Sequence, residues 1–170
     1  GNGAVSFTLV TSAFVETACS WICNVLAIKA LPRALVLGAS DVHVKQALEK
    51  FIFESLGIPA GDVLVENVGG AVHVGKTGNG SGSALNFGTT EYWHLMLERT
   101  ALLRDILDAG IAVLHFETDQ VWFEDPMPWI ERAMEVTTSD GSQNTLSRVK
   151  EVDMVVTINT RQEVSGNFFY

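Results

Sequence analysis

Short apolar runs alternate along this chain with longer segments of helical period, and this alternation constrains the fold more than any other feature of the sequence. Residues 5–10 (VSFTLV) have the length and composition of a buried strand. Residues 15–31 follow with a helical period, which places one set of small and apolar side chains on a single face: Val15, Ala18, Cys19, Ile22, Cys23 and Leu26. Repetition of such units predicts an α/β fold, with a mostly parallel central sheet and helices on both faces.

The same alternation continues to the end of the chain. Further strands are expected at residues 34–37, 62–68, 111–116, 153–158 and 167–170, and further helices at residues 41–56, 90–110 and 128–136. Pro32 is expected to end the first helix, and Gly57 and Gly110 the next two. With 170 residues, we expect one domain over residues 1–170. We also expect it to be incomplete at both ends, because it starts without Met and stops within an apolar run.

The charge balance restricts the partners. The formal net charge is −9 and no polybasic cluster is present, so we expect no nucleic acid to bind. Hydrophobic residues make up 47% of the chain, which is enough for a globular core. An acidic protein that binds an anionic ligand needs a local cation, which is either a basic side chain or a divalent metal.

Polar side chains follow three of the expected strands, at the point where each strand ends. Thr11 and Ser12 follow the first strand, Asp41 follows the second, and Glu117 and Asp119 follow the strand at residues 111–116. In open parallel sheets, ligands bind outside the carboxyl ends of the strands. One edge of the sheet is therefore expected to gather hydroxyl and carboxylate groups from separate segments.

Glu117 and Asp119 interrupt an otherwise apolar stretch that resumes with Trp122 and Phe123, both of which we expect in the core. If the backbone stays extended, the two carboxylates point to the same face and can aim oxygen ligands at one hard cation. Mn²⁺ or Mg²⁺ accepts such ligands. Two solvated turn residues would have the same spacing, so spacing alone leaves both interpretations open.

The surrounding residues extend this pair into a longer pattern. It runs from a helix with a basic residue, through a terminating glycine and an apolar strand, to two acidic residues, a Val-Trp pair and a proline. The matching positions are Arg99, Gly110, residues 111–116, Glu117-Thr118-Asp119, Val121-Trp122 and Asp125-Pro126, followed later by residues 153–157 and Gly166-Asn167-Phe168. The pattern resembles that of the nucleotide-diphospho-sugar transferases of the GT-A-type, Rossmann-like fold, which include plant cell-wall xylosyl- and arabinosyltransferases.

The resemblance implies roles for particular residues. Asp119 matches the acidic position that ligates the metal directly, whereas Glu117 stands where the family more often has Asp and would contact ribose or metal-bound water. Arg99 would approach the phosphates of the donor, and Asn167 would lie near its sugar. The strand-end residues would line the nucleotide pocket: Thr11, Ser12 and Asp41.

The function implied is transfer of a sugar from a nucleotide diphosphate donor to a carbohydrate or glycoprotein acceptor, with Mn²⁺ or Mg²⁺ stabilising the leaving diphosphate. The resemblance also implies the Golgi or another secretory compartment, with a membrane anchor outside this fragment. The glycosylation sequon at Asn79 is compatible with that location.

Two other functions remain as alternatives. Gly70, Gly75, Lys76 and Thr77 occupy the fixed positions of a phosphate-loop motif (GAVHVGKT, residues 70–77), which would indicate an NTPase. A phosphate loop must open a helix, and the glycine- and serine-rich residues 78–83 disfavour one, so we prefer the transferase. A non-catalytic nucleotide-sugar-binding domain is the second alternative.

Overall fold

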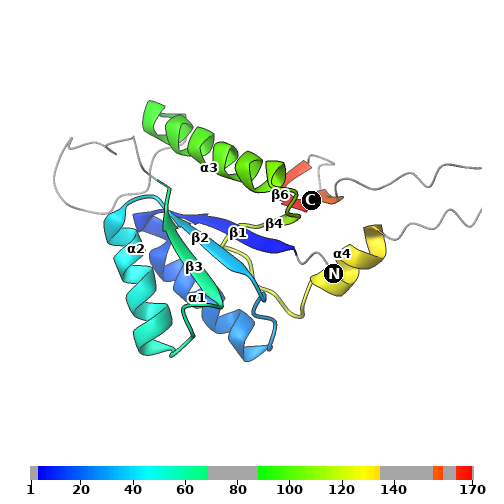
Figure 1. Ribbon diagram of the computed structural model, residues 1–170, viewed down its shortest axis with the longest axis horizontal. Coiled ribbons are helices and arrows are strands. Elements are labelled where there is room, and N and C mark those ends of the chain that lie inside the picture. The colour runs from blue at the N-terminus through cyan, green and yellow to red at the C-terminus, as the bar shows by residue number, and fades with distance from the viewer. Residues whose placement is uncertain (1–3, 69–87, 135–154, 159–163, 170) are drawn as a thin grey trace, which may run out of the picture.

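The computed structural model describes the backbone of residues 4–68, 88–134, 155–158 and 164–169, and the side chains of 4–68 and 88–130 (Figure 1). The phosphate-loop pattern at residues 70–77 lies outside the described residues.

The sheet has six strands in the order β3-β2-β1-β4-β6-β5. Their bounds are β1 Val5–Val10, β2 Leu35–Ala39, β3 Val63–Asn67, β4 Val113–His115, β5 Val155–Ile158 and β6 Val164–Phe169. β1 to β4 are parallel, and β6 runs antiparallel to both β4 and β5. Phe7 in the centre of β1 is in register with Val36 on one side and His115 on the other. The mostly parallel sheet is therefore confirmed.

Helices cover both faces of this sheet, as expected. The helical elements are η1 (a 3₁₀ turn, Ser12–Phe14), α1 (Val15–Ala27), α2 (Val42–Glu49), η2 (a π-helical turn, Lys50–Ser55), α3 (Thr90–Asp108) and α4 (Met127–Met134). α1 and α2 lie on one side of the sheet and α3 lies on the other (Figure 1). In the described residues, none of the helices is both long and apolar enough to cross a bilayer.

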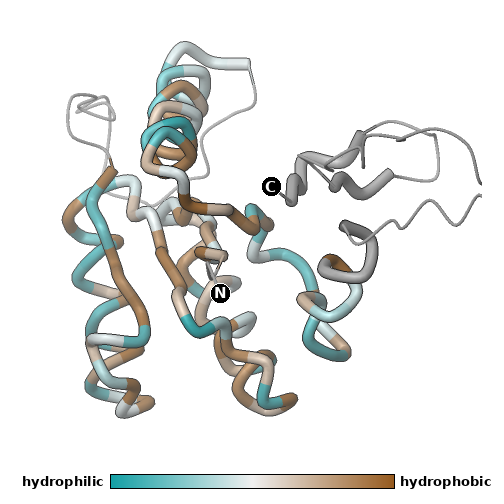
Figure 2. Tube along the Cα trace, turned by 45° about the vertical axis from the view of Figure 1, so that its right-hand side comes forward, coloured by the Kyte–Doolittle hydropathy of each residue, from teal (hydrophilic) through white to brown (hydrophobic). Residues whose placement is uncertain are grey.

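The larger part of the core lies between the sheet and the helices α1 and α2. Its fully buried members include Trp21 and Ile22 of α1, Leu48 of α2, and Leu37 of the sheet. The opposite face is covered by α3, where Leu95 is buried. Hydrophobic segments recur along the strands and along the helices packed on them (Figure 2). Burial of such side chains is the main favourable term in folding.

The helices end where the backbone conformation changes, and the apolar pattern of the sequence does not mark these points. The helix expected over residues 15–31 ends at Ala27, because Lys29 adopts a left-handed conformation (φ 58°) and the Ala30 N–H bonds the Val25 carbonyl at 2.8 Å. Gly57 (φ 68°) and Gly110 (φ 74°) do lie just after helical segments, in the left-handed conformation that glycine adopts without strain.

The strand expected at residues 111–116 is shorter than the apolar run. β4 spans only Val113–His115, although the Phe116 N–H still bonds the Phe7 carbonyl at 3.2 Å. Trp122 is partly buried, but the expectation for Phe123 was wrong, because this side chain is 90% exposed. An apolar pattern cannot show where a chain leaves the sheet.

Candidate active site

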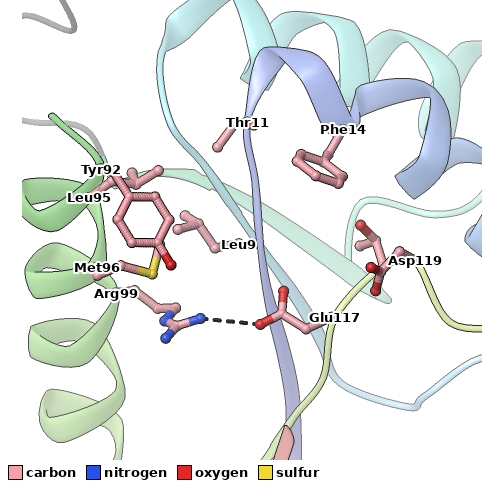
Figure 3. Close-up of a pocket in the computed structure, with 10 residues that line it drawn as sticks. Leu9, Thr11, Phe14, Tyr92, Leu95, Met96, Arg99, Glu117 and Asp119 are labelled. Carbon is pink, nitrogen blue, oxygen red and sulfur yellow. Dashed lines mark hydrogen bonds and ion pairs between the residues drawn. The ribbon is translucent and has the colours of Figure 1, made fainter. Parts of the chain in front are cut away.

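An open pocket of about 220 Å³ lies at the carboxyl ends of β1 and β4 (Figure 3). These two strands are neighbours although β2 and β3 intervene in the sequence, so the direction in which strands are added reverses here. Such a switch point opens a crevice, because the connections on its two sides lead to opposite faces. The pocket is lined by Leu9, Thr11, Phe14, Tyr92, Leu95, Met96, Arg99, Glu117, Thr118 and Asp119.

Three segments build the walls. α3 contributes Tyr92, Leu95, Met96 and Arg99, whose spacings of three and four residues place them on one helix face. The end of β1, with the 3₁₀ turn after it, contributes a second wall, and the turn at residues 117–119 contributes the third. The carboxylates of Glu117 and Asp119 lie at that third wall, and the guanidinium group of Arg99 reaches from the helix toward Glu117 (Figure 3).

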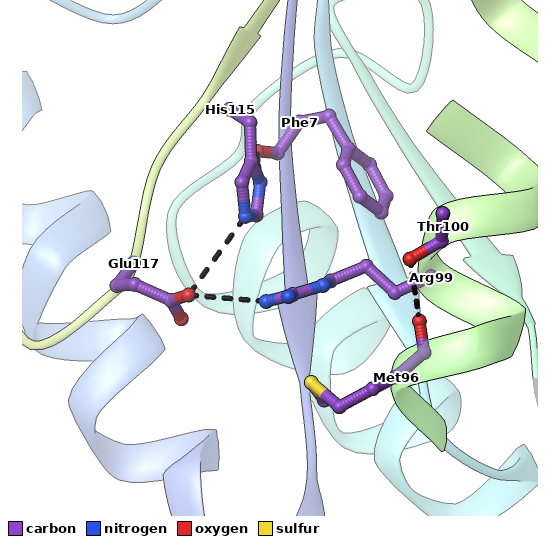
Figure 4. Close-up of polar contacts among 6 residues, drawn as sticks. All are labelled: Phe7, Met96, Arg99, Thr100, His115 and Glu117. Atoms are coloured by element: carbon purple, nitrogen blue, oxygen red, sulfur yellow. Dashed lines mark hydrogen bonds and ion pairs between the residues drawn. The ribbon is translucent and has the colours of Figure 1, made fainter. Parts of the chain in front are cut away.

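Arg99 and Glu117 form an ion pair across the pocket, with Nη1 3.2 Å from Oε1 (Figure 4). The side chains are 21% and 41% exposed, so water screens the pair only in part. Burial raises the pKa of the Glu117 carboxyl, the Arg99 cation lowers it, and the nearby Asp119 carboxylate raises it, with a net shift upward from 4.5. The guanidinium group therefore offsets part of the cost of partly burying the Glu117 carboxylate.

His115 lies beneath this pair and is 1% exposed. Its Nδ1 is 3.2 Å from the Phe7 carbonyl, and its Nε2 is 3.8 Å from Glu117 Oε1 (Figure 4). Burial and the Arg99 cation lower the pKa of His115 to about 4, so the ring is neutral at physiological pH. The contact with Glu117 is consequently not an ion pair, and Nδ1 donates its proton to the Phe7 carbonyl.

Asp119 differs from Glu117 in its surroundings. It is exposed at the rim, and no hydrogen bond or salt bridge holds its carboxylate to another side chain among the described residues. No cluster of three His, Cys, Asp or Glu side chains able to hold a metal occurs in that part of the chain. Two carboxylates fit Mg²⁺ or Mn²⁺ that takes its remaining ligands from water and a bound diphosphate. They do not form a closed metal site made of protein alone.

Two polar atoms of pocket residues are buried without a hydrogen bond in the described structure: Thr11 Oγ1 and Arg99 Nε. Buried polar groups in folded proteins nearly always have a partner. A polar ligand in the pocket would supply one for each, and the guanidinium group favours an anionic ligand.

The sequence pattern of the family described as nucleotide-diphospho-sugar transferase matches residues 60–170, which is more than half of the chain. The chain belongs to this family. It is also 23% identical over 139 residues to the UDP-D-xylose:L-fucose alpha-1,3-D-xylosyltransferase of Arabidopsis thaliana. The aligned region covers 82% of this chain and 33% of that protein, so the chain spans about a third of the relative's length. No solved structure matches at a comparable level of significance.

Membership of the nucleotide-diphospho-sugar transferase family confirms the resemblance seen in the sequence, and the parallel sheet with helices on both faces confirms the expected GT-A-like α/β architecture. Of the predicted site residues, the structure brings Thr11, Arg99, Glu117 and Asp119 into one pocket. Glu117 and Asp119 face it from a segment that has left β4 and turns at Thr118, so the backbone is not extended, which was the condition for both side chains to share a strand face.

Ser12, Asp41 and Asn167 are not among the residues that line this pocket. Ser12 is exposed in the 3₁₀ turn. The Asp41 side chain caps α2, where Oδ1 accepts hydrogen bonds from the His43 N–H at 2.9 Å and the Val44 N–H at 3.0 Å. Asn167 lies in β6, and its side chain is outside the described part of the structure. Their roles toward the donor stay predictions.

The sequence interpretation missed the apolar and aromatic wall, which includes Phe14, Tyr92 and Met96. A signal was present for α3, because Tyr92 and Met96 precede Arg99 by seven and three residues and so share its face. For Phe14 the sequence holds no such signal, since its direction depends on the 3₁₀ turn between β1 and α1.

Proposed function

We propose that this chain forms the donor-binding part of a glycosyltransferase that moves a sugar from a nucleotide diphosphate to a carbohydrate or glycoprotein acceptor. The observation that carries the proposal is the convergence of Arg99, Glu117 and Asp119 in the switch-point pocket of a nucleotide-diphospho-sugar transferase. The relative's name states UDP-D-xylose as its donor. A uridine diphosphate sugar is therefore our first choice of donor here.

The pocket residues divide the task of holding such a donor. Leu9, Phe14 and Tyr92 offer apolar surface that suits the nucleoside, and the charged end suits the diphosphate. The enclosed volume of about 220 Å³ is below the roughly 300–1,000 Å³ of ordinary ligand sites. The described residues thus enclose only part of a nucleotide sugar.

Negative charge builds on the diphosphate as the glycosidic bond breaks, and a protein of net charge −9 must offset it locally. A bound Mn²⁺ or Mg²⁺ would supply Lewis-acid neutralisation of that charge. Asp119 would ligate the metal directly, since its carboxylate is exposed at the rim. Glu117 would support it from beside Arg99, which favours the ionised form of the Glu117 carboxyl and contributes its own positive charge.

Thermal unfolding of the wild type and Asp119→Asn, with and without Mn²⁺ and uridine diphosphate, tests this function. A ligand that binds only the folded state raises its stability. We expect Mn²⁺ with uridine diphosphate to raise the Tm of the wild type and not that of Asp119→Asn. Without ligand, the variant should be as stable as the wild type or slightly more so, because a like charge beside Glu117 is removed.

The matched control is Asp62→Asn, which removes an exposed carboxylate just before β3, away from the residues that line the pocket. It should keep the full ligand-induced shift. Equal shifts in the wild type and Asp119→Asn would mean that Asp119 is not the metal ligand. Stabilisation by ATP or GTP that is lost in Lys76→Ala would support the NTPase instead, and donor binding without sugar transfer would support the non-catalytic domain.

The proposed location is the Golgi or another secretory compartment, with any membrane anchor outside these residues. The sequon at Asn79 supports it. Glycosidase treatment of the protein expressed in a eukaryotic host, compared with Asn79→Gln, tests whether the chain enters that pathway.

A further inference from the structure

Asn24 of α1 makes a reciprocal pair of hydrogen bonds with the backbone of Trp122, a residue 98 positions away in the sequence. Its Nδ2 donates to the Trp122 carbonyl at 3.0 Å, and its Oδ1 accepts from the Trp122 N–H at 2.9 Å. An amide side chain bonded in this way satisfies both polar groups of one peptide residue. The two bonds tie α1 to the chain just after residues 117–121, a segment that we call the acidic turn.

Aromatic packing holds the same region. Trp21 of α1 stacks on Phe116 with ring centroids 4.4 Å apart, and it meets the Trp122 ring edge-on at 5.1 Å. The rings of Phe116 and Trp122 are themselves 5.4 Å apart. The residue before the acidic turn and the residue after it are therefore anchored to one another and to the same helix.

The turn between these anchors, residues 117–121, carries both carboxylates of the candidate active site. Glu117 and Asp119 carry like charges and lie only two residues apart in the chain, so they repel each other. β4, which leads into the turn, has only three residues. A charged turn at the end of so short a strand needs external support to keep one geometry.

We propose that Asn24 is a positioning residue of the donor site, which fixes the acidic turn by clamping the backbone of Trp122. The part of this inference that concerns metal and donor rests on the function proposed above. Asn24 itself does not line the pocket. It acts through the backbone, so its removal should loosen the turn and weaken ligand binding without removing any group that touches the ligand.

The test compares Asn24→Ala with Ser20→Ala in the complete chain. Ser20 lies one turn earlier on α1, is exposed, and loses a side-chain hydrogen bond of 2.9 Å to the Glu16 carbonyl when it becomes alanine. Ser20→Ala thus matches the loss of a hydrogen bond without touching the turn. Asn24→Asp is a second variant, which keeps the acceptor for the Trp122 N–H and loses the donor to its carbonyl.

Amide hydrogen exchange, read residue by residue, gives the first measurement. We expect Asn24→Ala to speed exchange in residues 117–122 about tenfold or more, because it removes two hydrogen bonds and the loss of one bond of ordinary strength corresponds to a factor of up to about ten. Exchange in β1 should not change, and Ser20→Ala should behave as the wild type. Unchanged exchange in the turn, or an equal increase throughout the chain, would overturn the proposal. If Asn24→Ala does not fold, the same outcomes are judged on Asn24→Asp.

The second measurement is the affinity for Mn²⁺ with uridine diphosphate, determined by calorimetry below the unfolding transition. A clamp that only stabilises the fold would leave this affinity unchanged, whereas a positioning residue must alter it. We expect an affinity loss of about threefold to tenfold for Asn24→Ala and none for Ser20→Ala. Faster turn exchange with unchanged affinity would overturn the positioning role. A wild type that binds neither Mn²⁺ nor uridine diphosphate would overturn the proposed function and the positioning role together, and the exchange data would then decide the clamp alone.

Discussion

Arg99 of α3 and Glu117, two residues after β4, are joined by an ion pair of 3.2 Å between two walls of the pocket. The pair links the helix on one face of the sheet to the acidic turn at its edge. Since both side chains are partly shielded from water, removal of either partner leaves a charge that water solvates incompletely. The position of α3, which carries Arg99, and the ionisation of the Glu117 carboxyl are therefore coupled.

Arg99→Met should make stability depend more steeply on pH. Without the cation, burial and Asp119 raise the pKa of Glu117 further above its ordinary value of 4.5. A carboxyl with a higher pKa in the folded than in the unfolded chain binds more protons when folded, so stability falls as pH rises through that window. We expect the Tm of Arg99→Met to drop more than that of the wild type from pH 4.5 to neutrality.

Two variants isolate this effect. Arg99→Met/Glu117→Gln should lose the additional slope, because no titratable group remains at position 117. Arg104→Met removes an exposed cation of the same helix, whose ion pair with Asp105 is open to water, and should leave the slope unchanged. Parallel pH profiles for the wild type and Arg99→Met would contradict the coupling.

Asp41→Ala should lower stability by about 1 kcal/mol, because the first turn of α2 loses the acceptor for two of its N–H groups. Asp41→Ser should keep most of the stability, since serine is also a good N-cap. Chemical denaturation measures both. Donor affinity of Asp41→Ser then examines the nucleotide role predicted from the sequence: normal affinity would refute it, and a loss would support it.

Trp122→Ala and Phe123→Ala should differ sharply although the residues are adjacent. Trp122 packs on Trp21 and Phe116, so its truncation should cost about 2–3 kcal/mol. Phe123 is 90% exposed, and its truncation should change stability by less than about 0.5 kcal/mol. Urea unfolding of both variants measures the difference. A cost at Phe123 equal to that at Trp122 would show that the side chain is covered in the protein.

Gly38→Ala should destabilise the protein by about 1 kcal/mol and disturb the pocket. A Cβ at this position in β2 would lie 3.1 Å from Phe7 Cε2 and 3.3 Å from Leu9 Cδ1, and Leu9 lines the pocket. Gly61→Ala is the control, because its Cβ meets nothing within 4 Å and its φ is not positive. That variant should be neutral or stabilised by up to about 1 kcal/mol in a thermal melt. The prediction fails if the two variants melt alike.

The sequence was sufficient for the order of the elements and for several boundaries. β1 spans Val5–Val10 as expected, because a buried central strand is a continuous apolar run with polar residues at its end. Helix ends were less predictable. Lys29, just after α1, adopts the left-handed conformation that glycine usually takes at this position, and a lysine in the sequence does not predict it.

The sequence predicted only those residues of the candidate site that stand out within a short stretch of the chain. Glu117 and Asp119 stand out because carboxylates are rare beside buried strands, and Arg99 stands out through the family pattern. The ion pair between Arg99 and Glu117 depends on how α3 docks on the sheet, and the bonds between Asn24 and Trp122 join segments 98 residues apart. Such relationships belong to the tertiary structure, and no short pattern encodes them.

The alternating side chains of β1 serve separate parts of the molecule. Val10 belongs to the core beneath α1 and α2, whereas its neighbours Leu9 and Thr11 line the pocket on the side of α3. Neighbouring positions at the end of β1 thus have different surroundings. A substitution at Leu9 or Thr11 can therefore reshape the pocket and leave the core as it is, whereas a substitution at Val10 acts on the core.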